Sequence, residues 1–193
     1  DAVAQAPQRL RGIAVIPEDT SDAEFGRLHA AGFRGIRFTE NGPTLGTPGT
    51  SGTLGLAALR RMAPKLRVLG WHAQVWAKCQ YVVDSLPWMK DCGIPLVFDH
   101  MGMYDVTLGV DDPTFQLFLR FFDTGQAWVK LITHRVSKLR WDDCSDVRPF
   151  HDALLARAPE RVLWGTDWPY IGLDKDMPSV GGQLDLLRTW SGE

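Results

Sequence analysis

The chain has 193 residues, 45% of them hydrophobic, and a formal net charge of −2, so residues 1–193 are predicted to form a single domain with a sizeable core. Scattered Lys and Arg residues, and apolar runs shorter than the roughly 18 residues of a membrane span, argue against nucleic-acid and membrane partners. Three cysteines without a Cys-x-x-Cys pair predict neither disulfides nor a cysteine zinc site, and a cytoplasmic location is expected.

Short apolar, β-branched runs alternate with longer segments of helical period. The runs predict strands at residues 10–16, 33–38, 68–75, 95–99, 128–132 and 162–165. A capping box at Ser21-Asp22-Ala23-Glu24 begins the first helix, which ends at Gly32. Further helices are predicted at residues 54–62, 81–91, 113–122, 146–157 and 182–190. Strands that alternate with helices predict an α/β fold with a parallel sheet.

Two architectures can hold six such units: an open doubly wound sheet, or most of an eight-stranded barrel. No Gly-x-Gly-x-x-Gly or P-loop motif follows a strand, so a nucleotide site is not predicted. Residues 39–52 are rich in Gly, Pro and Thr and too long for an ordinary turn. This segment is either a substrate loop or a surface loop without a role.

The segment Gly165-Thr166-Asp167-Trp168-Pro169 follows the last apolar run. Proline cannot continue the strand, so Asp167 is expected at the carboxyl end of a buried strand, where barrel enzymes keep their catalytic groups. Asp167 is therefore the first candidate for a general base, and the alternative is that it caps the next turn.

Three earlier strands carry polar groups in the same part of the repeating unit: His72, His100 and Lys130, with Arg135 and Ser137 just beyond the last of these strands. One such histidine alone would favour a core role, but the series predicts an active site at a barrel mouth. A histidine or lysine there can polarise a carbonyl, and Arg135 with Ser137 can bind a carboxylate. The chemistry expected is hydrolysis without a covalent serine or cysteine intermediate.

The sequence resembles the amidohydrolase superfamily, in particular its branch of 2-pyrone-4,6-dicarboxylate lactonases and sugar-lactone hydrolases and isomerases. The segments that carry the resemblance begin at Gly32, Gly70, Phe98, Trp128, Arg135 and Gly165, and they read GFRGIRF, GWH, FDHMG, WVKL, RVS and GTDWP. The resemblance implies a (β/α)8 barrel of the amidohydrolase type, lacking here its first two strands and its carboxyl-terminal tail.

Within that resemblance, Asp167 activates water against a lactone carbonyl, His100 lies beside that carbonyl, and Arg135 and Ser137 hold a substrate carboxylate. His72 is a further catalytic candidate. Lys130, Arg37 and Trp168 are further substrate-binding candidates. The lactonase branch works without a metal. If a divalent ion such as zinc is bound, His72, His100 and Asp167 are its expected ligands.

Two departures from the family pattern bear on function. The family's first-strand His-x-His is absent from this sequence, which weakens the expectation of metal. Pyrone dicarboxylate lactonases carry basic residues in the loop after the Arg37 strand, whereas residues 39–52 contain no Lys or Arg. Within the resemblance, this favours a lactone with one carboxylate over a pyrone dicarboxylate. A lactone isomerase, a zinc-dependent decarboxylase and a non-catalytic barrel remnant that binds a partner remain alternatives, and the oligomeric state is not predicted.

Overall fold

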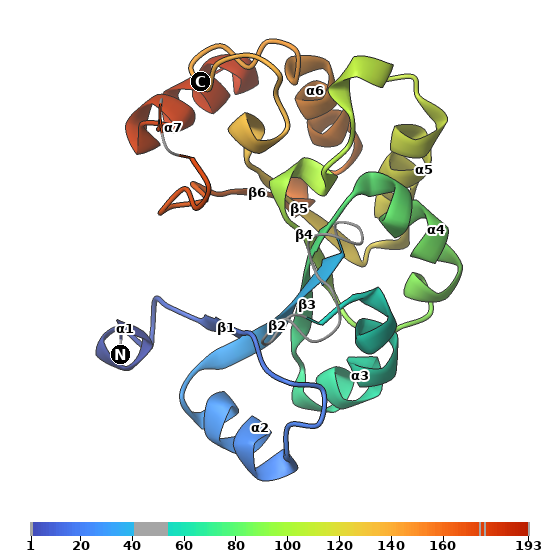
Figure 1. The fold of residues 1–193 in the computed structure, drawn as a ribbon, viewed down its shortest axis with the longest axis vertical. Coiled ribbons are helices and arrows are strands. Elements are labelled where there is room, and N and C mark those ends of the chain that lie inside the picture. The colour runs from blue at the N-terminus through green and yellow to red at the C-terminus, as the bar shows by residue number, and fades with distance from the viewer. Residues whose placement is uncertain (1, 41–53, 174, 176, 193) are drawn as a thin grey trace.

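The computed structural model describes residues 2–40, 54–173, 175 and 177–192, and in it six parallel strands form a curled sheet with helices on its convex side (Figure 1). The strands are β1 (Gly12–Ala14), β2 (Phe33–Glu40), β3 (His72–Ala77), β4 (Leu96–Phe98), β5 (Ala127–Leu131) and β6 (Val162–Trp164). They lie in the sheet in chain order. A doubly wound sheet reverses its strand order, so the curled half-barrel is the architecture found.

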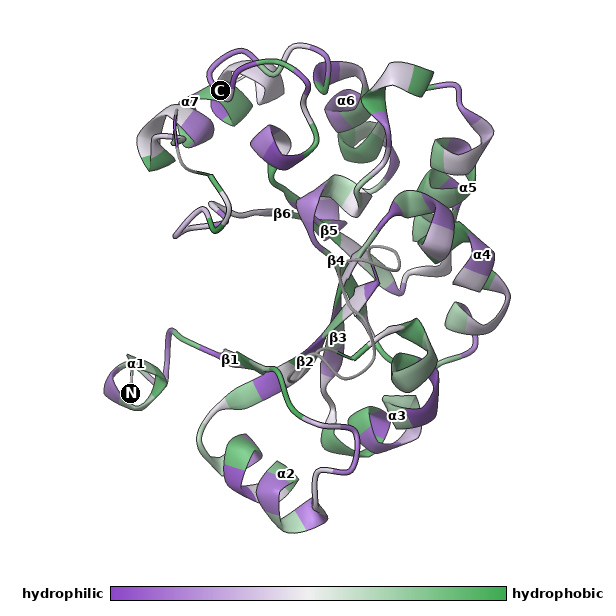
Figure 2. Cartoon of the chain, in the orientation of Figure 1, coloured by the Kyte–Doolittle hydropathy of each residue, from purple (hydrophilic) through white to green (hydrophobic). Residues whose placement is uncertain are grey.

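Apart from the short α1, which precedes β1, the helices follow the strands and cover one face of the sheet. They are α1 (Ala2–Gln5), α2 (Asp22–Ala30), α3 (Leu56–Leu69), α4 (Cys79–Met89), α5 (Pro113–Phe121), α6 (Arg148–Arg157) and α7 (Val180–Ser191). In Figure 2 the helices alternate between green and purple, as amphipathic helices do. Among the described residues, no helix has the length and apolar character needed to cross a membrane.

Alternation along the strands separates a helix-covered face from a polar face. In β3, Ala73, Val75 and Ala77 are buried in the hydrophobic core, whereas Gln74 and Trp76 are only partly buried and point the other way. The polar face of the central strands is therefore the concave side of the curl, and it is the side available to a ligand.

Two predicted bounds were wrong, the end of the helix 54–62 and the start of the strand 68–75. The predicted strand 68–75 starts only at His72, because α3 continues beyond its predicted end and includes Pro64. The helix ends where Gly70 takes a left-handed conformation with φ 64°. Leu59 and Leu66, both fully buried, extend the apolar face of the helix past the proline, so packing outweighs the local cost of Pro64. His72 consequently begins its strand.

Candidate active site

Two of the predicted catalytic residues lie in turns that follow strands of the sheet. His100 follows β4 with φ 48°, and Asp167 follows β6 with φ 56°. A positive φ is uncommon for residues other than glycine, although Asp and His tolerate it better than most. Such backbone conformations concentrate at functional sites, and here they place the two side chains against each other.

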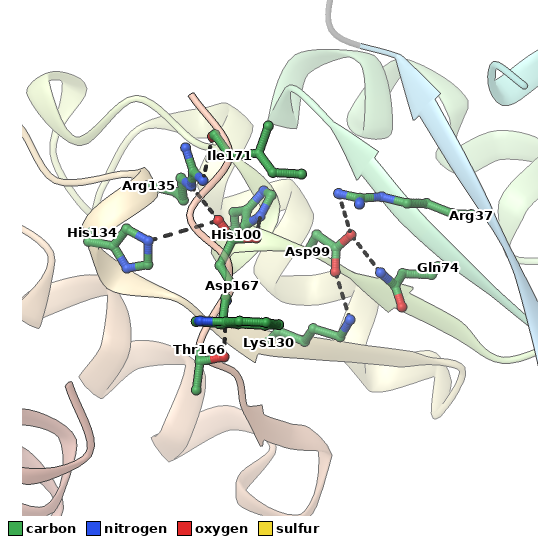
Figure 3. A network of polar contacts seen from close by, with 11 residues as sticks. Arg37, Gln74, Asp99, His100, Lys130, His134, Arg135, Thr166, Asp167 and Ile171 are labelled. Atoms are coloured by element: carbon green, nitrogen blue, oxygen red, sulfur yellow. Dashed lines mark hydrogen bonds and ion pairs between the residues drawn. The ribbon is translucent and has the colours of Figure 1, made fainter. Parts of the chain in front are cut away.

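Asp167 is the centre of a compact polar cluster (Figure 3). His100 Nε2 lies 3.1 Å from Asp167 Oδ1, and Arg135 Nε donates to Oδ2. His134 Nε2 lies 3.9 Å from the same Oδ2. Arg135 Nη2 also donates to the carbonyl oxygen of Ile171 over 2.8 Å. The Asp167 carboxylate is therefore fixed in orientation by groups from two other strand ends.

The electrostatics of this cluster keep Asp167 ionised and His134 neutral. Burial raises the pKa of Asp167, but the hydrogen bonds and charges of His100 and Arg135 outweigh it and lower this pKa to about 2. Burial and the neighbouring Arg135 cation lower the pKa of His134 to about 4, against the opposing attraction of Asp167. At neutral pH Asp167 is thus a carboxylate that can accept a proton.

A second cluster surrounds Asp99, the residue before His100. Its carboxylate accepts from Gln74 Nε2 over 3.0 Å and forms ion pairs with Lys130 Nζ at 3.0 Å and Arg37 Nη2 at 3.3 Å. The Asp99 side chain is only 3% exposed. Figure 3 shows the two clusters side by side, with Arg37 and Arg135 on opposite sides of His100.

The clusters border a cleft of about 550 Å³. Its lining includes Arg37, Trp76, His100, Arg135 and Asp167. The chain segment after Asp167 completes it with Trp168, Pro169 and Ile171. A cleft of this size suits a small organic molecule, and cationic and aromatic groups in its wall suit an anionic one.

The predicted residues divide into those that the cleft brings together and those that it does not. His100, Asp167, Arg135, Arg37 and Trp168 line it; the Trp168 side chain is 73% exposed. Lys130 lies beside the cleft through its ion pair with Asp99. Residues 41–53, which contain most of the predicted substrate loop, lie outside the described residues.

His72 and Ser137 are placed elsewhere. His72 pairs with Gly35 at the first position of β3, so Trp76, four residues farther along, lies roughly 13 Å closer to the carboxyl edge of the sheet. Burial and the charge of Lys130 lower the pKa of His72. Ser137 Oγ donates to Asp146 Oδ1 over 2.5 Å, within the loop after β5. Neither residue is part of the cleft lining.

The structure also adds residues that the sequence analysis did not select. Trp76 lies four residues after the predicted His72 in the same strand, so strand alternation places the two side chains on one face and could have pointed to Trp76. Asp99 ends the same predicted strand that His100 follows, so its position at a strand end could have pointed to it. His134 directly precedes Arg135 but lies in a 3-10 turn, for which the strand pattern gives no signal.

The side chains present do not by themselves form a metal centre. In the described parts of the chain, no group of three His, Cys, Asp or Glu residues lies close enough to hold an ion. Of the expected ligand set, His100 and Asp167 are in direct contact, whereas His72 is at the other end of its strand. No catalytic step is therefore assigned to a metal.

Known proteins are similar to this chain in sequence. A 2-pyrone-4,6-dicarboxylate hydrolase from Comamonas testosteroni is 33% identical over 97% of this chain and 62% of its own length. A 4-sulfomuconolactone hydrolase from Rhizobium radiobacter is 32% identical over 99% of this chain and 63% of its length. A D-galactarolactone isomerase from Agrobacterium fabrum is 28% identical over 87% of this chain and 55% of its length. The chain thus spans about three fifths of the first two relatives.

Solved structures agree with the half-barrel. An unliganded Agrobacterium tumefaciens protein matches with a TM-score of 0.81 at 26% identity, over 97% of this chain and 65% of that one. A probable 2-pyrone-4,6-dicarboxylic acid hydrolase from Acinetobacter baumannii, solved with citric acid bound, matches with a TM-score of 0.75 at 25% identity. The match covers 100% of this chain and 70% of that one. The amidohydrolase family model matches residues 1–191. The chain therefore belongs to the amidohydrolase family.

Proposed function

We propose that this chain carries the active site of a lactone hydrolase, a carboxylic ester hydrolase in which Asp167 activates water. The observation that carries the proposal is the Asp167 carboxylate, held by His100 and Arg135 at the wall of the cleft. The hydrolase names of two similar proteins support the substrate class, a lactone of a small carboxylated compound.

In the proposed reaction, water adds to the lactone carbonyl carbon while Asp167 takes one of its protons. His100 stabilises the oxyanion that forms on the carbonyl oxygen. When the tetrahedral intermediate collapses, the bond to the ring oxygen breaks, and Asp167 returns the proton to that oxygen. Lactone and water thus become one hydroxy acid, and the Asp167 carboxylate is regenerated.

Arg37 is the proposed anchor for the single substrate carboxylate. The resemblance gives this role to Arg135 and Ser137, but Arg135 already donates to Asp167 and Ile171, and Ser137 to Asp146. Arg37 lines the cleft, and its Nε has no hydrogen-bond partner among the described residues. Binding at Arg37 leaves Arg135 free to orient the Asp167 carboxylate.

A lactone isomerase is the second candidate, because a relative that is 28% identical carries that name. The isomerase would also use Asp167 to move a proton, so its products distinguish the two reactions. Hydrolysis releases one proton per turnover as the new acid ionises, whereas isomerisation gives an isomeric lactone and no net acid. A zinc-dependent decarboxylase would lose turnover after treatment with a chelator and release carbon dioxide.

The test is the Asp167→Asn variant of the intact natural protein, assayed on a panel of aldarate monolactones, each of which keeps one free carboxylate. Loss of the base should lower kcat by about a hundredfold to ten-thousandfold, with circular dichroism showing that the fold is retained. Asp123→Asn is the matched control, because Asp123 is also paired with an arginine, Arg157, but on the exposed surface. Turnover that survives Asp167→Asn unchanged would exclude Asp167 as the base.

A further inference from the structure

Asp99 is a buried charge that the proposed chemistry does not use. Its neighbours come from three other strands: Arg37 from β2, Gln74 from β3 and Lys130 from β5. A carboxylate that is 97% removed from solvent needs such partners, because burying an unpaired charge is costly. One side chain therefore ties together four adjacent strands on the concave face of the sheet.

The charges of this cluster do not balance. Arg37 and Lys130 bring two positive charges and Asp99 brings one negative charge, which leaves an excess of one positive charge at the cleft wall. Without Asp99 the two cations would repel each other and turn toward solvent. The carboxylate therefore both attracts the cations and limits where they can lie.

The orientation of Arg37 follows from two contacts. Asp99 binds its Nη2 atom, and the guanidinium lies over the Trp76 ring with its central carbon 5.0 Å from the ring centroid. Trp76 thus sets the plane of the guanidinium, and Asp99 sets its rotation in that plane. Its Nε is buried and has no hydrogen-bond partner among the described residues.

We propose that Asp99 is a positioning residue that holds Arg37 in the orientation needed to bind the anionic group of the substrate. This inference rests on the proposed function, in which Arg37 is the carboxylate anchor. Asp99 touches neither water nor the reacting carbonyl in the proposed reaction, so its effect belongs to substrate binding. A purely structural Asp99 would instead affect the fold independently of Arg37.

The experiment is a double-mutant cycle in the intact natural protein with Asp99→Asn, Arg37→Gln and the double variant. We expect Asp99→Asn to raise KM for the lactone at least about tenfold, because a charge-assisted contact is lost, and to change kcat much less. The double variant should have the KM of Arg37→Gln alone, because Asp99 acts through Arg37. The Kd of citrate, an anionic probe, should be measured by calorimetry. It should rise in Asp99→Asn, and in the double variant it should equal the Kd of Arg37→Gln alone.

Asp123→Asn is again the matched control and should leave KM and the citrate Kd unchanged. If Asp99→Asn does not fold, Gln74→Leu removes one hydrogen bond to Asp99 and keeps all three charges of the cluster. It should raise KM about twofold to tenfold, and this increase should vanish in the Arg37→Gln background. The inference would be overturned if KM and the citrate Kd did not change. It would also be overturned if the increase in KM of the double variant equalled the product of the increases of the two single variants, because the two residues would then act independently.

The two proposals can fail separately. If no lactone is turned over but citrate binding follows the expected cycle, the proposed function is wrong and the role of Asp99 stands. If lactone turnover depends on Asp167 while Asp99→Asn leaves KM and citrate binding unchanged, the function stands and the role of Asp99 is wrong. Failure of citrate to bind the wild-type protein counts against the role of Asp99.

Discussion

At the scale of single residues, His134 links the stability of the protein to pH. Its side chain is 2% exposed, and burial with the nearby Arg135 lowers its pKa from 6.5 to about 4. Between these pH values the unfolded chain binds a proton at this residue and the folded protein does not. The free energy of unfolding therefore falls as the pH is lowered from 6.5 to 4, by up to about 3 kcal/mol.

His134→Gln removes this proton-binding difference. Thermal unfolding should show that Tm of the wild-type protein falls by roughly 5–10 °C more than Tm of the variant between pH 6.5 and 4. At pH 8 the imidazole is neutral in both states, so the difference in Tm measured there isolates the packing effect of the substitution. Parallel Tm curves for the two proteins between pH 8 and 4 would contradict the prediction.

Asp167 adds a second loss of stability at lower pH. Its pKa is about 2 in the folded protein against an ordinary value of 3.8. The unfolded chain therefore binds this proton first as the pH falls from 3.8 to 2, and the stability contributed by the ionised carboxylate is lost in that range. Above pH 3.8 the carboxylate is ionised in both states, so the proposed base is available throughout the neutral range.

The position of polar residues relative to the apolar runs predicted part of the candidate site. Asp167 and His100 were selected because they follow apolar runs, and the structure places them in contact. His72 is predicted within a strand rather than after one, and its place in that strand depends on the boundary that α3 shifts. The ion pairs of Asp99 connect strands that are far apart in the sequence, and the strand pattern does not determine their register.

At the scale of elements, the turn after β4 depends on Gly102. This residue has φ 81°, and a Cβ added to it would lie 2.6 Å from the buried ring of Phe118. The same turn contains His100. A side chain at this position would therefore push on the core from one side and on the turn that contains His100 from the other.

Gly102→Ala and Gly109→Ala form a matched pair. Gly109 has φ 82°, but an added Cβ would meet nothing within 4 Å. Both substitutions cost about 1–2 kcal/mol of unfolding free energy through the left-handed backbone, and Gly102→Ala should cost a further 1–3 kcal/mol or so through overpacking. Urea unfolding measures both values. An equal loss of unfolding free energy in the two variants would show that the turn adjusts to the added Cβ without disturbing Phe118.

Most helices and strands could be predicted because the hydrophobic period and the capping residues indicate the same bounds along the chain. Apart from α1, α3 and β3, the described helices and strands begin and end within about two residues of their predicted bounds. The N-cap half of the predicted capping box is confirmed, with Ser21 Oγ accepting from the Glu24 amide, while the Glu24 carboxylate accepts from Arg27. The errors at α3 and β3 share one cause: the helix is held by tertiary contacts past a residue that disfavours helix locally.

At the scale of the whole molecule, the described sheet is open at both ends. Among the described residues, β1 pairs only with β2, and β6 pairs only with β5. Leu163 and Trp164 of β6 are 38% and 44% exposed, and Trp168 and Ile171 beyond the strand are 73% and 80% exposed. An apolar strand with unpaired backbone groups is a template for association with another chain.

We therefore expect the 193-residue chain, expressed by itself, to associate through β6. Light scattering after size exclusion should give a multiple of 21.6 kDa that grows with protein concentration. Replacing Leu163 and Trp164 together by Lys should shift the chain toward the monomer, because charges on an edge strand oppose pairing. Val68→Lys is the control, since Val68 is 88% exposed but lies on α3. A monomeric mass at every concentration, or equal dissociation by Val68→Lys, would exclude β6 as the associating edge.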